Sequence, residues 1–196
     1  SALVTDACAQ AGARTLVVAG AGVQARQQVV SVCAVRPIEE VRVWARRTER
    51  AAAFVEEVRG ALGRHVRIAA YASLDEAARG ADVIGTATAA KAPIARFGDL
   101  ADHVHINCMG GHTTESRELP PELLRHCTLI VEDVPTAVAE AGPLHAGALS
   151  LADLVKRDMT ELRDRRTVFG STGHAFLDLV TTAHLLRALG VGETSL

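Results

Sequence analysis

Residues 14–25, Arg-Thr-Leu-Val-Val-Ala-Gly-Ala-Gly-Val-Gln-Ala, decide the fold of this chain. The apolar run that ends at Gly20 is typical of a strand buried on both faces. A helical pattern follows from residue 23 and stops before Pro37, because proline disfavours helix in the preceding residue. Between them, the pattern G-x-G-x-x-A allows a tight turn at Gly20 and the close approach of a pyrophosphate at Gly22. We therefore predict a dinucleotide site, the alternative being a tight turn without a ligand. The predicted contacts are Gly20, Ala21, Gly22, Val23 and Gln24.

The rest of the chain alternates strand and helix patterns. Strands are predicted over residues 14–20, 41–44, 66–70, 82–88, 103–109, 128–132 and 167–169. Helices are predicted over 23–35, 48–58, 74–79, 121–125, 134–141, 151–157 and 174–189, with Thr48 and Ser73 as N-caps. Parallel strands need crossover connections, and we expect a helix in each of them. The sequence therefore predicts an α/β fold, a doubly wound (Rossmann) parallel sheet with helices on both faces, in one domain over 1–196.

Composition excludes several classes of protein. Of the 196 residues, 48% are hydrophobic and 22% are charged, so the chain can bury a core and is not a disordered segment. A net charge of -2 and an aromatic fraction of 3% argue against a nucleic-acid binder. No apolar stretch is long enough for a membrane span, and residues 1–6 lack the features of a signal peptide. Four scattered cysteines favour thiols in a reducing cytoplasm over disulfide bonds.

The end of the second predicted strand bears on the choice between NAD and NADP. An acidic residue there would bond the ribose 2′-hydroxyl, whereas an arginine would favour a 2′-phosphate. The sequence has Arg46, Arg47 and Thr48, with no acid before Glu49. We therefore predict that NADP is favoured over NAD, with Arg46 as the first contact. The alternative is a solvated pair of arginines at the start of a surface helix.

A metal site is considered and not predicted. His103, His105, Cys108 and His112 have suitable ligand types, but strand alternation puts His103 and His105 on one face and Cys108 on the other.

Five motifs carry a resemblance to a known family. They are GAGVQAR (20–26), VRPIEEVRVW (35–44), ADVIGTAT (81–88), NCMGG (107–111) with REL (117–119), and VFGSTGHAFLD (168–178). In this order, over essentially the whole chain, they resemble the cofactor domain of the ornithine cyclodeaminase/mu-crystallin family. The resemblance implies hydride transfer between a nicotinamide dinucleotide and the amine- or imine-bearing carbon of an amino acid or cyclic imine, as oxidoreductase or lyase chemistry of amino-acid metabolism. It also implies cofactor contacts from Thr86, Ala87, Thr88, Asn107, Met109, Gly110 and Ser171.

One departure from the family pattern concerns the proton-transfer residue. The residue after Gly110-Gly111 is His112, where the cyclodeaminases carry an aspartate proposed as the catalytic base. An imidazole with an unperturbed pKa of about 6.5 exchanges protons at neutral pH. His112 is therefore the candidate catalytic residue, the alternative being a polar loop residue without a catalytic role.

A second departure concerns the substrate. The family's substrate-binding domain precedes its cofactor domain, and this chain starts after the position of that domain. We expect a chain that binds the cofactor but lacks most of the substrate pocket, from a homodimeric parent enzyme. The alternative is a mu-crystallin-like binding protein that depends on the cofactor and turns nothing over.

Overall fold

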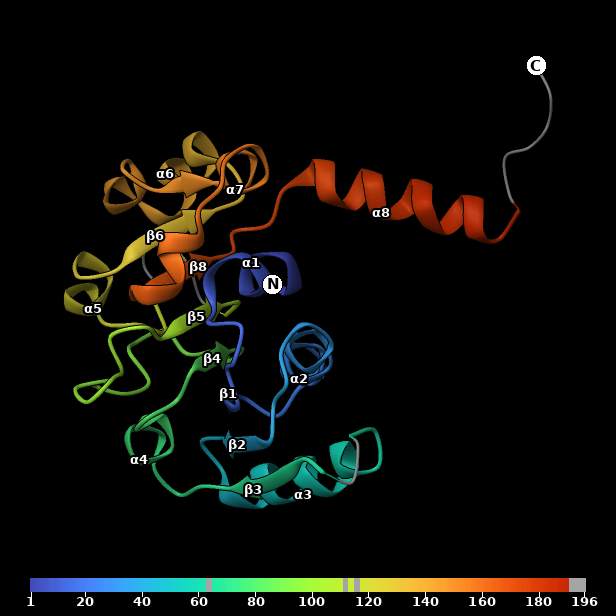
Figure 1. The fold of residues 1–196 in the computed structure, drawn as a ribbon, viewed down its shortest axis with the longest axis vertical. Coiled ribbons are helices and arrows are strands. Elements are labelled where there is room, and N and C mark those ends of the chain that lie inside the picture. The colour runs from blue at the N-terminus through green and yellow to red at the C-terminus, as the bar shows by residue number, and fades with distance from the viewer. Residues whose placement is uncertain (63–64, 111–112, 115–116, 191–196) are drawn as a thin grey trace.

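The computed structural model describes residues 1–62, 65–110, 113–114 and 117–190 (Figure 1). Within these ranges eight strands form one sheet: β1 (Thr15–Ala19), β2 (Glu40–Trp44), β3 (Arg67–Ala70), β4 (Val83–Thr86), β5 (His105–Cys108), β6 (Thr128–Val131), β7 (Leu149–Ser150) and β8 (Thr167–Gly170). Their order is β3-β2-β1-β4-β5-β8-β6-β7, and every neighbouring pair is parallel. The predicted doubly wound α/β fold is therefore confirmed.

Helices cover both faces of the sheet, and α8 (Ala175–Ala188) is the exception. The others are α1 (Ala2–Cys8), α2 (Val23–Val35), α3 (Thr48–Arg59), α4 (Leu74–Ala78), α5 (Pro121–Arg125), α6 (Val134–Ala141) and α7 (Leu151–Lys156), with the 3₁₀ turns η1 (Pro143–His145) and η2 (Thr160–Asp164). Alternate residues of β1 point to opposite faces. Leu16 and Val18 pack with α2 and α3, whereas Val17 and Ala19 pack with α4 and α5. The apolar run of β1 is therefore buried on both sides, as the sequence predicts.

Helix α1 is an element that the sequence analysis did not predict. It contacts α2, α7, η2 and β5, and its Val4 and Cys8 belong to a core cluster that also contains Phe169 of β8. The buried Arg36, at the end of α2, donates to the carbonyl oxygens of Asp6 and Ala9 at 2.6 and 2.9 Å. α1 therefore covers the middle of the sheet next to α2.

Two local predictions need correction. The connection from β4 to β5, residues 87–104, is irregular throughout, so this crossover has no helix. It is held instead by Asp75, whose carboxylate accepts from the N–H groups of Arg96 and Phe97. Thr48 is the first residue of α3 and not its N-cap, which is Arg47. Ser73 does cap α4, since its side chain accepts from the N–H of Glu76 at 3.3 Å.

A buried polar network joins α1 to the middle of the sheet. Nδ1 of His105 lies 2.8 Å from Oγ1 of Thr167, and its Nε2 lies 3.2 Å from Oδ1 of Asn107. The Asn107 amide in turn donates to Oγ1 of Thr5 at 2.8 Å. Burial lowers the pKa of His105 from 6.5 to about 3, because the imidazolium would lose its hydration. His105 is therefore neutral in the folded chain at any pH near neutrality.

This histidine makes stability depend on pH. Below pH 6.5 the unfolded chain takes up a proton at His105 that the folded chain does not, so stability is lost as the pH falls. Between pH 7.5 and 5.0 we expect the free energy of unfolding to decrease by about 2 kcal/mol through this residue. Urea unfolding at the two pH values measures it. His105→Gln should show a smaller decrease, with a remainder from His145, whose pKa burial also lowers. An equal decrease in both proteins would contradict the assignment.

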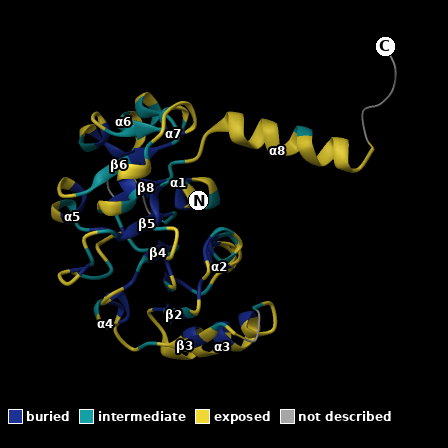
Figure 2. Ribbon diagram, viewed as in Figure 1, coloured by how far each residue is buried: buried dark blue, intermediate teal, exposed yellow. Residues whose placement is uncertain are grey.

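Helix α8 stands apart from the rest of the molecule. Figure 1 shows it projecting away from the sheet, and Figure 2 shows its surface as exposed along its length. None of its residues is buried, although Phe176 and Leu179 are large and apolar, with exposed fractions of 60% and 63%. In the described part of the chain, no helix combines the length and apolar character needed to cross a membrane.

Candidate functional site

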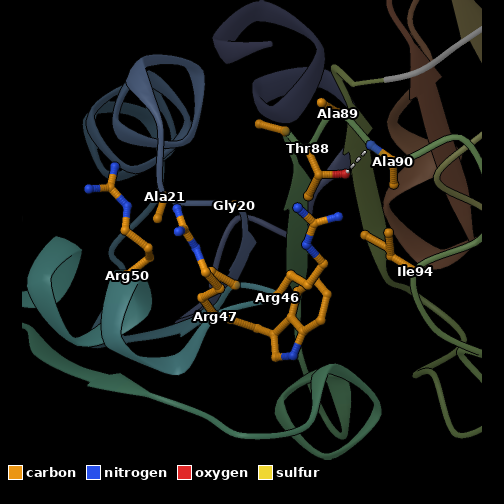
Figure 3. Close-up of a pocket in the computed structure, with 12 residues that line it drawn as sticks. Gly20, Ala21, Arg46, Arg47, Arg50, Thr88, Ala89, Ala90 and Ile94 are labelled. Carbon is orange, nitrogen blue, oxygen red and sulfur yellow. Dashed lines mark hydrogen bonds between the residues drawn. The ribbon is translucent and has the colours of Figure 1, made fainter.

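A pocket of about 380 Å³ lies at the carboxyl ends of the central strands (Figure 3). The sheet order runs from β1 to β2 and β3 on one side and from β1 to β4 and beyond on the other. Ligands of open α/β sheets bind in the crevice where the strand order reverses in this way. The lining residues are Gly20, Ala21, Trp44, Ala45, Arg46, Arg47, Arg50, Ala87, Thr88, Ala89, Ala90 and Ile94.

The predicted glycine turn forms one side of this pocket. Gly20 has a φ of 129°, and its N–H donates to the Trp44 carbonyl at 2.8 Å. A Cβ at Gly20 would overlap the carbonyl of Ala87, so this position requires glycine in both conformation and space. Gly22 is the N-cap of α2 and provides no side chain to bond the first N–H groups of the helix. The N-terminus of α2 is therefore open to an anion.

Val23 and Gln24 lie in the first turn of α2. Their side chains are exposed and do not line the pocket, so only their backbone N–H groups are placed for the predicted contact.

Three arginines line the side of the pocket at the end of β2. Arg46 and Arg47 were predicted, and Arg50, one turn into α3, joins them. In Figure 3 the side chains of Arg46 and Arg47 rise from the end of β2 toward the loops that carry Ala21 and Thr88. Among the described residues that line the pocket none is acidic, so the positive charges face it without a competing carboxylate. Thr48 does not line the pocket, and its hydroxyl lies 3.4 Å from Oε1 of Glu49.

The end of β4 forms the opposite side. Ala87 and Thr88 line the pocket as predicted positions, together with Ala89 and Ala90, which the sequence analysis did not single out. Thr86, also predicted as a cofactor contact, is fully buried and does not line the pocket. Its hydroxyl donates to Oε2 of Glu118 at 2.8 Å, and this hydrogen bond helps to hold the loop after β4 in place.

The side chain of Asn107 is fully buried in the network beneath α1, where it meets His105 and Thr5. Its contact with the cofactor stays a prediction. Met109 follows at the end of β5 and packs partly buried against the core cluster that contains Val4 and Phe169.

Gly110 and Ser171 lie at the ends of β5 and β8. The N–H of Gly110 donates to Oε2 of Glu118 at 2.8 Å. The Ser171 hydroxyl donates to Oε1 of Glu132 at 2.5 Å, and the N–H of Thr172 donates to the other oxygen of this carboxylate at 3.2 Å. Each of the two strand-end loops is therefore fixed by one carboxylate.

His112 lies outside the described residues, so the structure gives its side chain no position. The other side chains considered as metal ligands point to different partners. His103 faces Asp82 at 3.0 Å, His105 faces Thr167, and the Cys108 thiol donates to Glu118. The described residues contain no group of three His, Cys, Asp or Glu side chains that could hold a metal ion.

Glu118 is the buried site residue that sequence reasoning missed. It is fully buried, and its carboxylate accepts hydrogen bonds from groups at the ends of both β4 and β5. Burial, and then the neighbouring Glu118 carboxylate, raise the pKa of the Cys108 thiol to about 12. A carboxylate in the short stretch REL, between an arginine and a leucine, gave no local sign of burial. Its partners lie up to 32 residues away in the chain.

Comparisons with known proteins agree with this architecture. The chain is 31% identical to a Δ1-pyrroline-2-carboxylate reductase of Bacillus cereus (98% of this chain, 64% of the relative) and 36% identical to the ketimine reductase mu-crystallin of Mus musculus (92% and 57%). The solved Δ1-pyrroline-2-carboxylate reductase of Thermococcus litoralis, in complex with NADH and L-proline, superimposes with a TM-score of 0.82 at 28% identity (99% and 64%). The chain thus spans about three-fifths of the length of these relatives. The family model of the ornithine cyclodeaminase/mu-crystallin family matches residues 1–187, and the chain belongs to this family.

Proposed function

We propose that this chain is the dinucleotide-binding part of an oxidoreductase that transfers hydride at the imine- or amine-bearing carbon of a cyclic imine or an amino acid, with NADP(H) favoured over NAD(H). One observation carries the proposal. The pocket at the reversal of strand order joins a glycine turn, an open helix N-terminus and three arginines. A dinucleotide with a 2′-phosphate needs these groups. The names of the Bacillus and mouse relatives, and the NADH and L-proline in the Thermococcus structure, support the reaction class.

Different groups of the described residues are assigned to different parts of the dinucleotide. The N–H groups at the start of α2 bind the pyrophosphate, and Arg46 with its neighbours Arg47 and Arg50 binds the 2′-phosphate. Because the end of β2 holds the adenosine ribose in this fold, the pocket takes the adenosine half. Gly110 and Ser171 lie further along the sheet, toward the nicotinamide half. When bound, the nicotinamide supplies the hydride.

His112 is the residue to which we assign the proton that the substrate nitrogen gains or loses. It follows Gly110-Gly111 directly in the sequence, and imidazole both donates and accepts a proton near neutral pH. The aspartate of the resembling cyclodeaminases would be replaced in this role by a group with a higher unperturbed pKa.

Calorimetric titration of the chain with NADPH tests the proposal. We expect binding that adenosine 2′,5′-bisphosphate competes away more effectively than AMP, because the arginines face the 2′-position. We expect no reduction of Δ1-pyrroline-2-carboxylate by this chain alone, since it spans about three-fifths of its relatives and substrate orientation supplies much of the rate. Absence of NADPH binding would refute the proposal. A longer protein that binds NADPH yet reduces no imine would instead favour a cofactor-dependent binding protein.

Two further proposals concern the surroundings of the protein. We place it in a reducing cytoplasm, supported by four cysteines that are all thiols in the structure, and a thiol-labelling count on protein from cells tests this. We also propose that the full-length parent is a homodimer, supported by the exposed apolar side chains of α8. Sedimentation equilibrium of the parent should give a dimer that dissociates when Phe176, Leu179 and Val180 are changed to serine. An unchanged association state would contradict the second proposal.

A further inference from the structure

Five donors converge on the carboxylate of Glu118. Its Oε1 accepts from the N–H and the hydroxyl of Thr88 at 2.6 and 2.5 Å. Its Oε2 accepts from the Thr86 hydroxyl and the Gly110 N–H, both at 2.8 Å, and from the Cys108 thiol at 3.8 Å. An ionised carboxylate accepts only, and this one has a donor for each of its accepting directions. Among the described residues it forms no ion pair, so hydrogen bonds stabilise this buried group.

The donors come from two neighbouring strand-end loops, and the first of these loops lines the pocket. Thr86 and Thr88 belong to the end of β4 and the loop after it, whereas Cys108 and Gly110 belong to the end of β5 and the loop after that. One carboxylate therefore fixes the position of the first loop relative to the second. Gly110 must be glycine for this contact, because a Cβ there would overlap the Glu118 carboxylate.

The same residue reaches the lining of the pocket by two routes. Thr88 lines the pocket, and its hydroxyl, besides donating to Glu118, accepts from the Ala90 N–H at 3.2 Å (Figure 3). Ile94 also lines the pocket, and its N–H donates to the backbone carbonyl of Glu118 at 2.9 Å. Hydrogen bonds to Glu118 therefore hold in position the side of the pocket that lies opposite the arginines.

We propose that Glu118 is a positioning residue of the dinucleotide site, one that touches no ligand and fixes the pocket loop that carries Thr88 by joining it to Gly110 of the neighbouring loop. The inference rests on the proposed dinucleotide function. Replacing one carboxylate oxygen by an amide group would put a donor against a donor, either the N–H of Thr88 or that of Gly110. One loop would then have to move, since a buried unpaired donor is costly.

The structure offers a matched control in Asp82, which lies at the amino ends of the central strands, away from the pocket. Its carboxylate also accepts from backbone N–H groups of another strand, those of Arg14 and Thr15 at 2.8 and 2.9 Å, and it faces His103. Glu118→Gln and Asp82→Asn each replace a carboxylate that accepts hydrogen bonds from backbone N–H groups. Of these two carboxylates, the one of Glu118 contacts a residue that lines the pocket. If NADPH affinity depended on the general rigidity of the chain, both variants would weaken binding. If it depends on the position of the Thr88 loop, Glu118→Gln alone would weaken binding.

The experiment measures NADPH affinity and thermal stability of the whole chain in both variants. We expect Glu118→Gln to weaken NADPH binding at least tenfold and Asp82→Asn to leave it within twofold, although both lower Tm. Equal weakening in the two variants, or unchanged affinity in Glu118→Gln, would overturn the inference. If the unsubstituted chain does not bind NADPH, the proposed function fails first, independently of Glu118.

A second variant keeps the test decisive if Glu118→Gln does not fold. Thr88→Val removes one donor to Glu118 and leaves the Thr88 backbone bond. We expect weaker NADPH binding and, where the double variant can be made, a loss smaller than the sum of the two single losses, because both act through one contact. Full affinity in Thr88→Val, or strictly additive losses, would contradict the inference.

Discussion

Gly20→Ala is expected to lower the free energy of unfolding by about 2–4 kcal/mol, whereas Gly22→Ala is expected to cost less than about 1 kcal/mol. Gly20 has a φ of 129°, and an added Cβ would overlap the carbonyl of Ala87 at the end of β4. Gly22 has an extended conformation with a φ of -114°, and an added Cβ would meet no atom within 4 Å. Urea unfolding of the two variants measures the difference.

Gly22→Ala, which should cost little stability, is expected to weaken NADPH binding strongly. The methyl group of Gly22→Ala would stand before the open N-terminus of α2, where the pyrophosphate is proposed to lie. We therefore expect a folded, stable variant whose NADPH affinity is at least about tenfold lower, a loss of roughly 1.4 kcal/mol. A Gly20→Ala protein as stable as the parent, or a Gly22→Ala protein with full affinity, would show that the turn does not have the role assigned to it.

Arg46→Ala should reduce the preference of the site for NADPH over NADH. A charge-assisted hydrogen bond to a phosphate contributes about 1.5–3 kcal/mol, so NADPH affinity should fall roughly 10- to 100-fold. NADH lacks the 2′-phosphate, and its affinity should stay within about twofold. Arg47 and Arg50 remain in the variant and would hold part of the preference. Calorimetry with both dinucleotides at low and high salt measures the effect, which should be smaller at high salt.

Arg59→Ala provides the control for this experiment. Arg59 lies in the last turn of α3, pairs with Glu56 at 3.2 Å and does not line the pocket. Its loss removes one positive charge outside the pocket and should change neither affinity. Equal affinity of the parent chain for NADPH and NADH, or an equal effect of Arg46→Ala and Arg59→Ala, would contradict the assignment of the 2′-phosphate to Arg46.

Local patterns were sufficient to predict most of the fold. The bounds of α2, α5 and α6 agree with the prediction, in which Pro37 stops the pattern of α2 and Pro121 opens α5. The buried central strands were found from their continuous apolar runs. Helix α1 and the two-residue strand β7 were missed, since one had no apparent start signal and the other was too short to show a period.

The candidate site was predictable where the chain itself makes the contact. Gly20, Arg46 and Thr88 line the pocket because each lies within two residues of the carboxyl end of a strand. Asn107 is buried by α1, a helix that lies about 100 residues earlier in the sequence. Strand alternation alone therefore did not reveal its burial. Glu118 was missed for the same reason, because its role exists only when two loops and a third segment meet in space.

The position of α1 has a consequence for the order in which the chain folds. Residues 2–8 precede in the chain the partners that they contact in β5, α7 and η2, and Arg163 donates to the carbonyl of Asp6 at 3.1 Å. Contacts over such long sequence separations form slowly, because a large loop must close before they contribute any stability. During translation, Val4 and Cys8 therefore remain without their complete core until Phe169 has left the ribosome. Their docking is expected to be a late, rate-limiting step, and the interval before it is when the nascent chain is most open to chaperones.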